Sequence, residues 1–229
     1  MDVIKMDMDM DMGVMPGLML ALSKAETVRA GTYKIPIKGT DMVVTFQSKL
    51  DESDKGVIYA ALAEGLVKAL GMTAKVLLEV AIRNGMKKRP AVLRPLKNVM
   101  SEIVFGTNED STEDLGDGLV FASCESGMSD GFGAACLLYP GFLKMAGERL
   151  GGGFYILPSS RHELLFLPAM DVDNVNAQEM REKVRTINQN EVEERDRLSD
   201  EIYFSKGGKF FHVNVNGALD EINLEALGE

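Results

Sequence analysis

The polar segment Ser159-Ser160-Arg161-His162-Glu163 contains the residue types that nucleophilic hydrolases use. A serine hydroxyl becomes a nucleophile when a histidine takes its proton and a carboxylate orients that histidine. On an extended segment Ser160 and His162 share one face, whereas Glu163 points to the other. Catalytic sets are usually assembled from distant parts of a chain, and the sequence contains no G-x-S-x-G motif. The pattern therefore favours the bend of a hairpin. If the segment has a second role, binding is favoured over catalysis.

Binding at this bend would involve Arg161 and His162. Tyr139 joins them as a candidate because its helical stretch leads into the strand pair that carries the bend. Both faces of the strand at 164–168 are apolar, which is typical of a strand inside a sheet with layers on either side. We therefore expect His162 to be at least partly buried and hydrogen-bonded to a neighbouring loop or backbone group.

A basic segment at 86–97 is the second candidate binding surface. It contains Lys87, Lys88, Arg89, Arg94 and Lys97 and no acidic residue, whereas the loop at 107–117 is acidic. A small anion or an acidic partner would suit the basic segment. Local charge runs are more often only solvated surface, so a turn that pairs with the acidic loop is the preferred interpretation.

The cysteines and histidines of the chain do not have the spacing of a known metal-binding motif. The only cysteines and histidines are Cys124, Cys136, His162 and His212, and their spacing does not match a zinc site. Segments 7–18 and 171–182 match a calcium loop only in part. The glycines at 127, 131 and 133 match neither a dinucleotide-binding loop nor a Walker loop. We expect no metal and no cofactor.

The charge of the chain excludes several classes of partner. The formal net charge is −10 over 229 residues, so the chain lacks the basic footprint of general nucleic-acid binding or of docking on anionic membranes. The apolar run at 13–22 is too short to span a bilayer, and it follows acidic residues that a signal peptide does not have. Two cysteines without a disulfide framework are typical of a reducing compartment. We therefore expect a cytoplasmic protein. The sequence does not identify its protein or small-molecule partner or its oligomeric state.

Hairpins and helices must position these residues. Hairpins are expected where runs rich in strand formers flank turn residues, at 32–46, 154–169 and 201–215. Helices are expected where apolar residues recur at helical spacing, at 56–70, 73–85, 95–106, within 131–153 with a break at Pro140, and at 176–189. Thr73 and Asn176 are the expected N-terminal caps, and Gly106 is expected just past the end of its helix. The helix at 176–189 should bury Met180, Val184 and Ile187.

The order of these elements shows no regular alternation of strand and helix, which favours an α+β fold with a mainly antiparallel sheet and about four to five packed helices. We expect a single domain at 31–216. Before it, residues 1–30 should form an acidic Met/Asp-rich tail and a short lead-in helix. After it, residues 217–229 should form an acidic tail.

The stretch at 131–169 resembles a bacterial family catalogued as domain of unknown function 5688. The family carries a Gly-Ala-Ala…Leu-Tyr-Pro stretch, then Ile-Leu-Pro-Ser-Ser and His-Glu before an apolar strand. The matching positions are Gly133, Ala134, Ala135, Leu138, Tyr139, Pro140, Ile156, Leu157, Pro158, Ser159, Ser160, His162 and Glu163. The resemblance covers about residues 75–205 and implies the fold and a bacterial origin. It implies no activity, and members usually begin with a longer N-terminal region than this chain has.

No complete catalytic or cofactor motif is present, so the first functional hypothesis is a non-enzymatic cytoplasmic binding or regulatory module. The alternative is a hydrolase that uses Ser159 or Ser160 with His162 and a carboxylate, either Glu163 or one from elsewhere in the chain.

Overall fold

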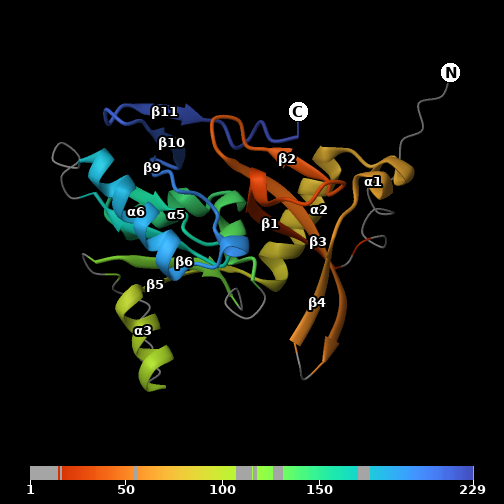
Figure 1. Cartoon of the computed structure of the whole chain (residues 1–229), viewed down its shortest axis with the longest axis horizontal. Helices are drawn as coiled ribbons and strands as arrows, with labels where there is room; N and C mark the ends of the chain where they lie inside the picture. Colours follow the sequence, from red (N-terminus) through yellow and green to blue (C-terminus); the bar gives the residue numbers. More distant parts are fainter. Residues whose placement is uncertain are drawn as a thin grey trace.

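Two antiparallel sheets lie side by side in the computed structural model (Figure 1). The structure describes residues 15, 17–53, 56–106, 115, 118–125, 131–169 and 176–228. Residues 1–14 of the predicted tail, most of the acidic loop at 107–117, Gly127, and the aspartates at 171 and 173 lie outside the described residues.

The first sheet has the order β1-β3-β2, with β4 also paired to β3. Its strands are β1 (Leu18–Lys24), β2 (Lys34–Pro36), β3 (Met42–Ser53) and β4 (Gly56–Ala61). The predicted hairpin at 32–46 is confirmed: Ile35 lies opposite Val44, and Pro36 lies on an edge strand, where its missing N–H costs no sheet hydrogen bond.

Two expectations for this part of the chain were wrong. Residues 18–24 form β1 and no lead-in helix, because all seven residues pair with β3. Residues 56–61 form β4, and the helix predicted at 56–70 is reduced to α1 (Glu64–Leu70). Strand β3 is long enough to pair with β4, and Val57, Ile58 and Tyr59 are residue types that favour strands.

The second sheet has the order β11-β10-β9-β7-β8-β6-β5. Its strands are β5 (Ala91–Pro95), β6 (Val120–Cys124), β7 (Phe154–Leu157), β8 (Leu164–Pro168), β9 (Tyr203–Lys206), β10 (Lys209–Val213) and β11 (Leu219–Ile222). The predicted hairpins β7–β8 and β9–β10 are confirmed. Strand β11 lies in the segment expected to be only an acidic tail, and its pairing with β10 makes it part of the sheet.

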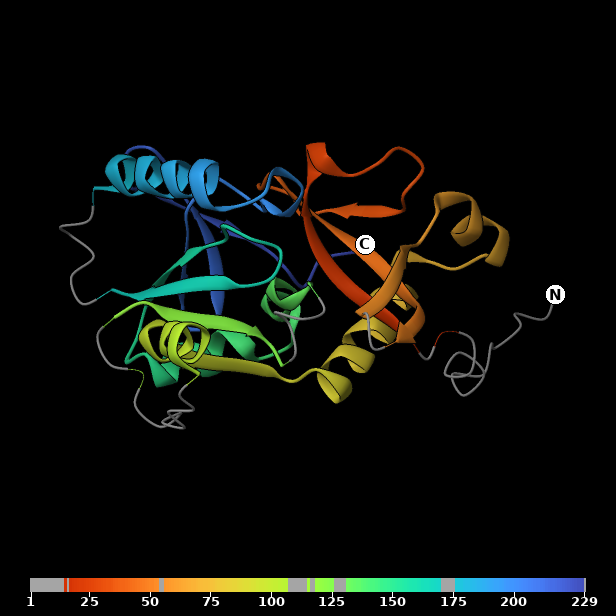
Figure 2. The same cartoon turned by 60° about the horizontal axis from the view of Figure 1, so that its bottom comes forward.

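Helices cover both faces of the second sheet, as Figure 2 shows for α6 (Ala177–Glu191) on one face and α5 (Phe142–Arg149) on the other. Phe154 and Phe166 pack with Phe142 of α5, whereas Tyr155 packs in a separate cluster that contains Val184 of α6. Strands β7 and β8 are inner strands of this sheet. Their apolar character on both faces follows from this position between two layers.

The helix boundaries follow their predicted capping residues. Thr73 Oγ1 accepts a hydrogen bond from Val76 N at the start of α2 (Ala74–Lys88), and Asn176 Oδ1 accepts one from Glu179 N at the start of α6. Helix α3 (Leu96–Phe105) ends at Gly106, which has a left-handed conformation with φ of 66°. The capping residues in the sequence therefore predicted these ends correctly.

The helical stretch predicted within 131–153 is broken at Pro140, as expected. A 3₁₀ helix, η3 (Gly133–Leu138), ends before Pro140, and α5 begins two residues after it. The main hydrophobic core contains side chains from both sheets, including Leu22 and Phe46 of the first and Phe154 and Phe166 of the second. This shared core makes the chain a single-domain α+β fold, which confirms the predicted fold class. Within the described residues, no helix combines the length and the apolar character needed to cross a membrane.

Candidate functional site

The predicted polar segment 159–163 connects β7 to β8, and its side chains hold the connection in place. Ser160 is buried, and its Oγ accepts a hydrogen bond of 2.9 Å from the backbone N–H of His162. The same hydroxyl lies 3.4 Å from Glu163 Oε2. The backbone of the segment also pairs with the loop at 193–199, through Leu198 N to Ser159 O at 3.1 Å. These bonds define a structural bend.

His162 faces a carboxylate of another loop. Its Nε2 lies 3.5 Å from Asp196 Oδ2, and its side chain is 32% exposed. The partial burial agrees with the prediction, and the acidic group belongs to a neighbouring loop. The predicted hydrogen bond of the imidazole is not present among the described residues, and Nδ1 is buried without a partner. In the described part of the chain, no hydrogen bond joins the imidazole to the hydroxyl of Ser159 or Ser160. Burial raises the pKa of Glu163, although the charge of His162 and the hydroxyl of Ser160 oppose this.

Arg161 packs beside the same bend. Its Nε donates a hydrogen bond of 3.0 Å to Gly131 O, and its guanidinium lies 4.6 Å from the centre of the Phe132 ring. Arg161 Nε also lies 3.6 Å from Asp196. Through Nε and the contact with the Phe132 ring, the guanidinium thus links the bend to the segment before η3.

We expect His162→Ala to lower the free energy of unfolding by about 1 kcal/mol, because the variant loses the contact with Asp196 and part of the packing beside Gly131. Urea unfolding of the full chain measures this cost. Ser159→Ala should cost less than this, since no side-chain hydrogen bond of Ser159 is present among the described residues. Equal stability of wild type and His162→Ala would contradict the structural role of His162.

The remaining predicted binding residues do not form one surface. Tyr139 is buried, and its hydroxyl donates to Arg89 O at 3.2 Å and accepts from Cys124 Sγ at 3.3 Å. Arg89 is buried near Met19, whereas Lys87 and Lys88 are exposed at the end of α2. The candidate basic surface is therefore interrupted, because the chain turns inward after α2.

The two cysteines contribute to this interior cluster as free thiols. A hydrogen bond with Cys136 lowers the pKa of Cys124 to about 7, while burial raises the pKa of Cys136. Burial, together with the charge of Cys124, raises the pKa of Tyr139. Within the described residues, no group of three or more His, Cys, Asp or Glu side chains is placed to hold a metal ion. The absence of a metal or cofactor stays a prediction.

A cavity of about 770 Å³, here called the α6 pocket, is the site that the sequence did not predict. It lies between the turn of the β2–β3 hairpin, one face of α6, and the strands β9 and β10. Its lining residues are Gly39, Thr40, Asp41, Gln178, Arg181, Glu182, Arg185, Glu201, Tyr203, His212, Asn214 and Val215. Ligand pockets typically measure about 300–1,000 Å³, so the α6 pocket has the size of a small-molecule site.

Arg181 is the buried charge of the α6 pocket. Its Nε donates to Glu201 Oε2 at 2.7 Å and its Nη2 to Val213 O at 2.5 Å, while Nη1 is buried without a hydrogen-bond partner among the described residues. His212 Nε2 lies 3.1 Å from the same Glu201 oxygen. Burial raises the pKa of Glu201, but the hydrogen bonds from His212 and Arg181 outweigh this and hold it below its usual value.

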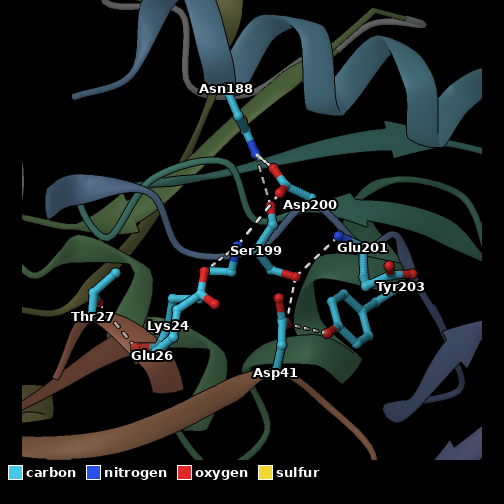
Figure 3. A network of polar contacts seen from close by, with 9 residues as sticks. All are labelled: Lys24, Glu26, Thr27, Asp41, Asn188, Ser199, Asp200, Glu201 and Tyr203. Atoms are coloured by element: carbon cyan, nitrogen blue, oxygen red, sulfur yellow. Dashed lines mark hydrogen bonds and ion pairs between the residues drawn. The ribbon is translucent and has the colours of Figure 1, made fainter. Parts of the chain in front are cut away.

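Asp41 is the second charged group of the pocket, and it is fixed by a network that Figure 3 shows. Its Oδ1 accepts hydrogen bonds from Ser199 Oγ at 2.6 Å and from Tyr203 Oη at 3.2 Å. Asn188 of α6 extends the network by donating to Ser199 O and to Asp200 Oδ1, each at 2.9 Å. The network thus fixes the β2–β3 turn against the segment that follows α6.

Burial raises the pKa of Asp41, although the hydrogen bond from Ser199 opposes this. The folded state therefore binds this proton more tightly than the unfolded chain, so the resulting stability is present at low pH and is lost as the pH rises through the folded pKa. Asn cannot ionise, so we expect wild type to gain stability relative to Asp41→Asn as the pH falls from about 7 to about 4.5.

Urea unfolding of both proteins over this pH range measures the difference, with the exposed Asp51→Asn as the control. A difference that stays constant with pH, or that changes in the other direction, would show that ionisation of Asp41 is not opposed by the fold.

Arg181 and Asp41 were not predicted as site residues because the sequence next to them contains no recognisable motif. For Arg181, the spacing of the buried residues of α6 does provide a signal. These residues are Ala177, Arg181, Val184 and Asn188, at steps of four, three and four, which is the spacing of a helix face that packs on a core. Met180 and Ile187 were predicted to lie on that face, but Ile187 is exposed.

The comparison with family models covers most of the chain. The model of DUF5688, a family of unknown function, matches residues 18–206. The chain belongs to this family. The match begins at β1, so the N-terminal hairpin belongs to the DUF5688 domain, whereas the sequence resemblance was expected only over about 75–205. No curated protein and no solved structure matches the chain.

Proposed function

We propose that this DUF5688 member is a non-enzymatic binding or regulatory module and that its ligand enters the α6 pocket. The observation that carries this proposal is the buried guanidinium of Arg181 in a cavity of about 770 Å³. Its Nε and Nη2 are paired, but its Nη1 is buried without a hydrogen-bond partner among the described residues, and a buried polar group without a partner is costly. A ligand that supplies a partner would remove this cost.

The surroundings of the 159–163 segment also support a binding role. The hydroxyl of Ser160 accepts from a backbone N–H, and the imidazole of His162 faces Asp196, so the pair that a serine hydrolase needs is not formed. A bacterial, cytoplasmic setting belongs to the same proposal. The buried free thiols Cys124 and Cys136 support the cytoplasmic part, because unpaired cysteines are typical of a reducing compartment. The bacterial part rests on the family resemblance alone.

A thermal-shift screen of the full chain against a panel of polar metabolites tests the proposed function. We expect at least one compound to raise the unfolding temperature of wild type, because a ligand that binds only the folded state stabilises it. The same compound should have less effect on Arg185→Ala, in which a cation that lines the pocket is removed. A compound that stabilises both proteins equally would place the binding site elsewhere.

Fluorophosphonate labelling and a panel of ester and phosphoester substrates test the hydrolase alternative on the same protein. We expect neither labelling nor turnover. Labelling of Ser159 or Ser160 that is lost in His162→Ala would contradict the non-enzymatic role and establish the alternative.

A further inference from the structure

We infer that the α6 pocket binds a small zwitterion of the amino-acid class, with its carboxylate at Arg185 and its ammonium at Asp41. This inference rests on the proposed function and adds the chemical class of the ligand. It follows from which charges of the pocket are already used by the fold and which remain available.

Arg185 provides the available positive charge. It lies one helical turn after Arg181, lines the pocket and is exposed. Among the described residues, Arg185 has neither a hydrogen bond nor an ion pair. A guanidinium presents several N–H groups in the planar arrangement that matches a carboxylate. A ligand carboxylate can therefore pair with Arg185 without displacing an existing contact.

Arg181 has a different role. Its Nε and Nη2 are occupied by Glu201 and by the carbonyl of Val213. Glu201 is in turn shared with His212, so this acid is also engaged. Arg181 therefore adds a fixed positive charge behind the carboxylate site, whereas Arg185 makes the direct contact.

Asp41 provides the available acceptor. Ser199 and Tyr203 both donate to its Oδ1, so Oδ2 has no side-chain hydrogen bond among the described residues. Asp41 belongs to the β2–β3 turn and Arg185 belongs to α6, so the two groups come from separate parts of the pocket lining. An ammonium group of the ligand can donate to Oδ2 while the carboxylate pairs with Arg185.

Other ligand classes fit these charges less well. The pocket lining contains three carboxylates, those of Asp41, Glu182 and Glu201, which repel a phosphate dianion. It also contains two arginines, which repel a simple cation. A zwitterion meets Arg185 and the Oδ2 atom of Asp41, whereas the exposed Glu182 accepts a hydrogen bond from Gln178. The net charge of a zwitterion adds nothing to the field of the pocket.

Isothermal titration of the full chain with each of the twenty standard L-amino acids tests the inference. The best binder is then compared with its decarboxylated amine and its deaminated acid. We expect the amino acid to bind more tightly than either analogue. Arg185→Ala should weaken its binding by about tenfold or more, the loss expected for one charge-assisted contact.

Lys183→Ala is the matched control, because it removes the same charge from the same helix at an exposed position outside the pocket lining. Equal binding of the deaminated acid, or unchanged binding in Arg185→Ala, would overturn the inference. If no amino acid binds but another metabolite from the screen depends on Arg185, the zwitterion inference fails while the proposed binding function stands. If no compound binds in the pocket, both fail.

Discussion

We expect Arg181→Leu to lower the free energy of unfolding by about 3 kcal/mol, measured by urea unfolding of the full chain. The guanidinium is buried between α6 and the second sheet, where it pairs with Glu201 and donates to Val213 O. Leucine leaves that carbonyl without its donor and Glu201 without its closest cation. Glu201 keeps some contact with water, which places the cost at the lower end of the range for breaking a buried ion pair.

Arg185→Ala is the control for this measurement. It removes the same charge one turn later on the same helix, but from an exposed side chain without an ion pair among the described residues. Its effect should stay within about 0.5 kcal/mol. Similar costs for the two substitutions would show that the loss comes from the charge of α6 and not from the buried contacts of Arg181.

The substitution Gly133→Ala should also destabilise the chain strongly, by about 3 kcal/mol or more. A Cβ atom at this position would overlap Ser123 Oγ and the carbonyl oxygen of His162. These two atoms form a hydrogen bond of 3.0 Å that fixes the 159–163 bend against β6. The variant must therefore break this bond or move the start of η3 away from the bend.

Gly65→Ala provides the comparison, because a Cβ at Gly65 in α1 has no atom within 4 Å. Alanine is the better helix former, so this variant should be as stable as wild type or more stable, by up to about 1 kcal/mol. Thermal unfolding of both variants measures the contrast. A Gly133→Ala protein as stable as Gly65→Ala would contradict the close packing of the bend.

Much of the fold could be predicted from the sequence because its signals are local. Thr73, Asn176 and Gly106 mark helix ends through hydrogen bonds or a backbone conformation that involve only their neighbours. The hairpins β7–β8 and β9–β10 were found for the same reason. Strand β4 was missed although it forms a local hairpin with β3, in which Gly56 pairs with Ser53. Ile58, Leu62 and Leu66 recur at four-residue spacing, and this pattern predicted a helix instead.

The candidate site could be predicted only in part. Segment 159–163 was a candidate because serine, histidine and glutamate occur close together in the sequence. In the fold, however, Ser160 Oγ accepts a hydrogen bond from the backbone N–H of His162 and not from its imidazole. The α6 pocket combines Asp41 with Arg181, which are 140 positions apart, so only the folded chain brings them together.

The most direct test of the pocket as the binding site is a ¹H–¹⁵N NMR titration of the labelled full chain with the best ligand from the thermal-shift screen. We expect the largest amide shifts at the pocket lining, in Thr40, Gln178, His212 and Asn214. Largest shifts at Ser160 and His162, with the pocket unchanged, would contradict this expectation and make the 159–163 bend the functional site.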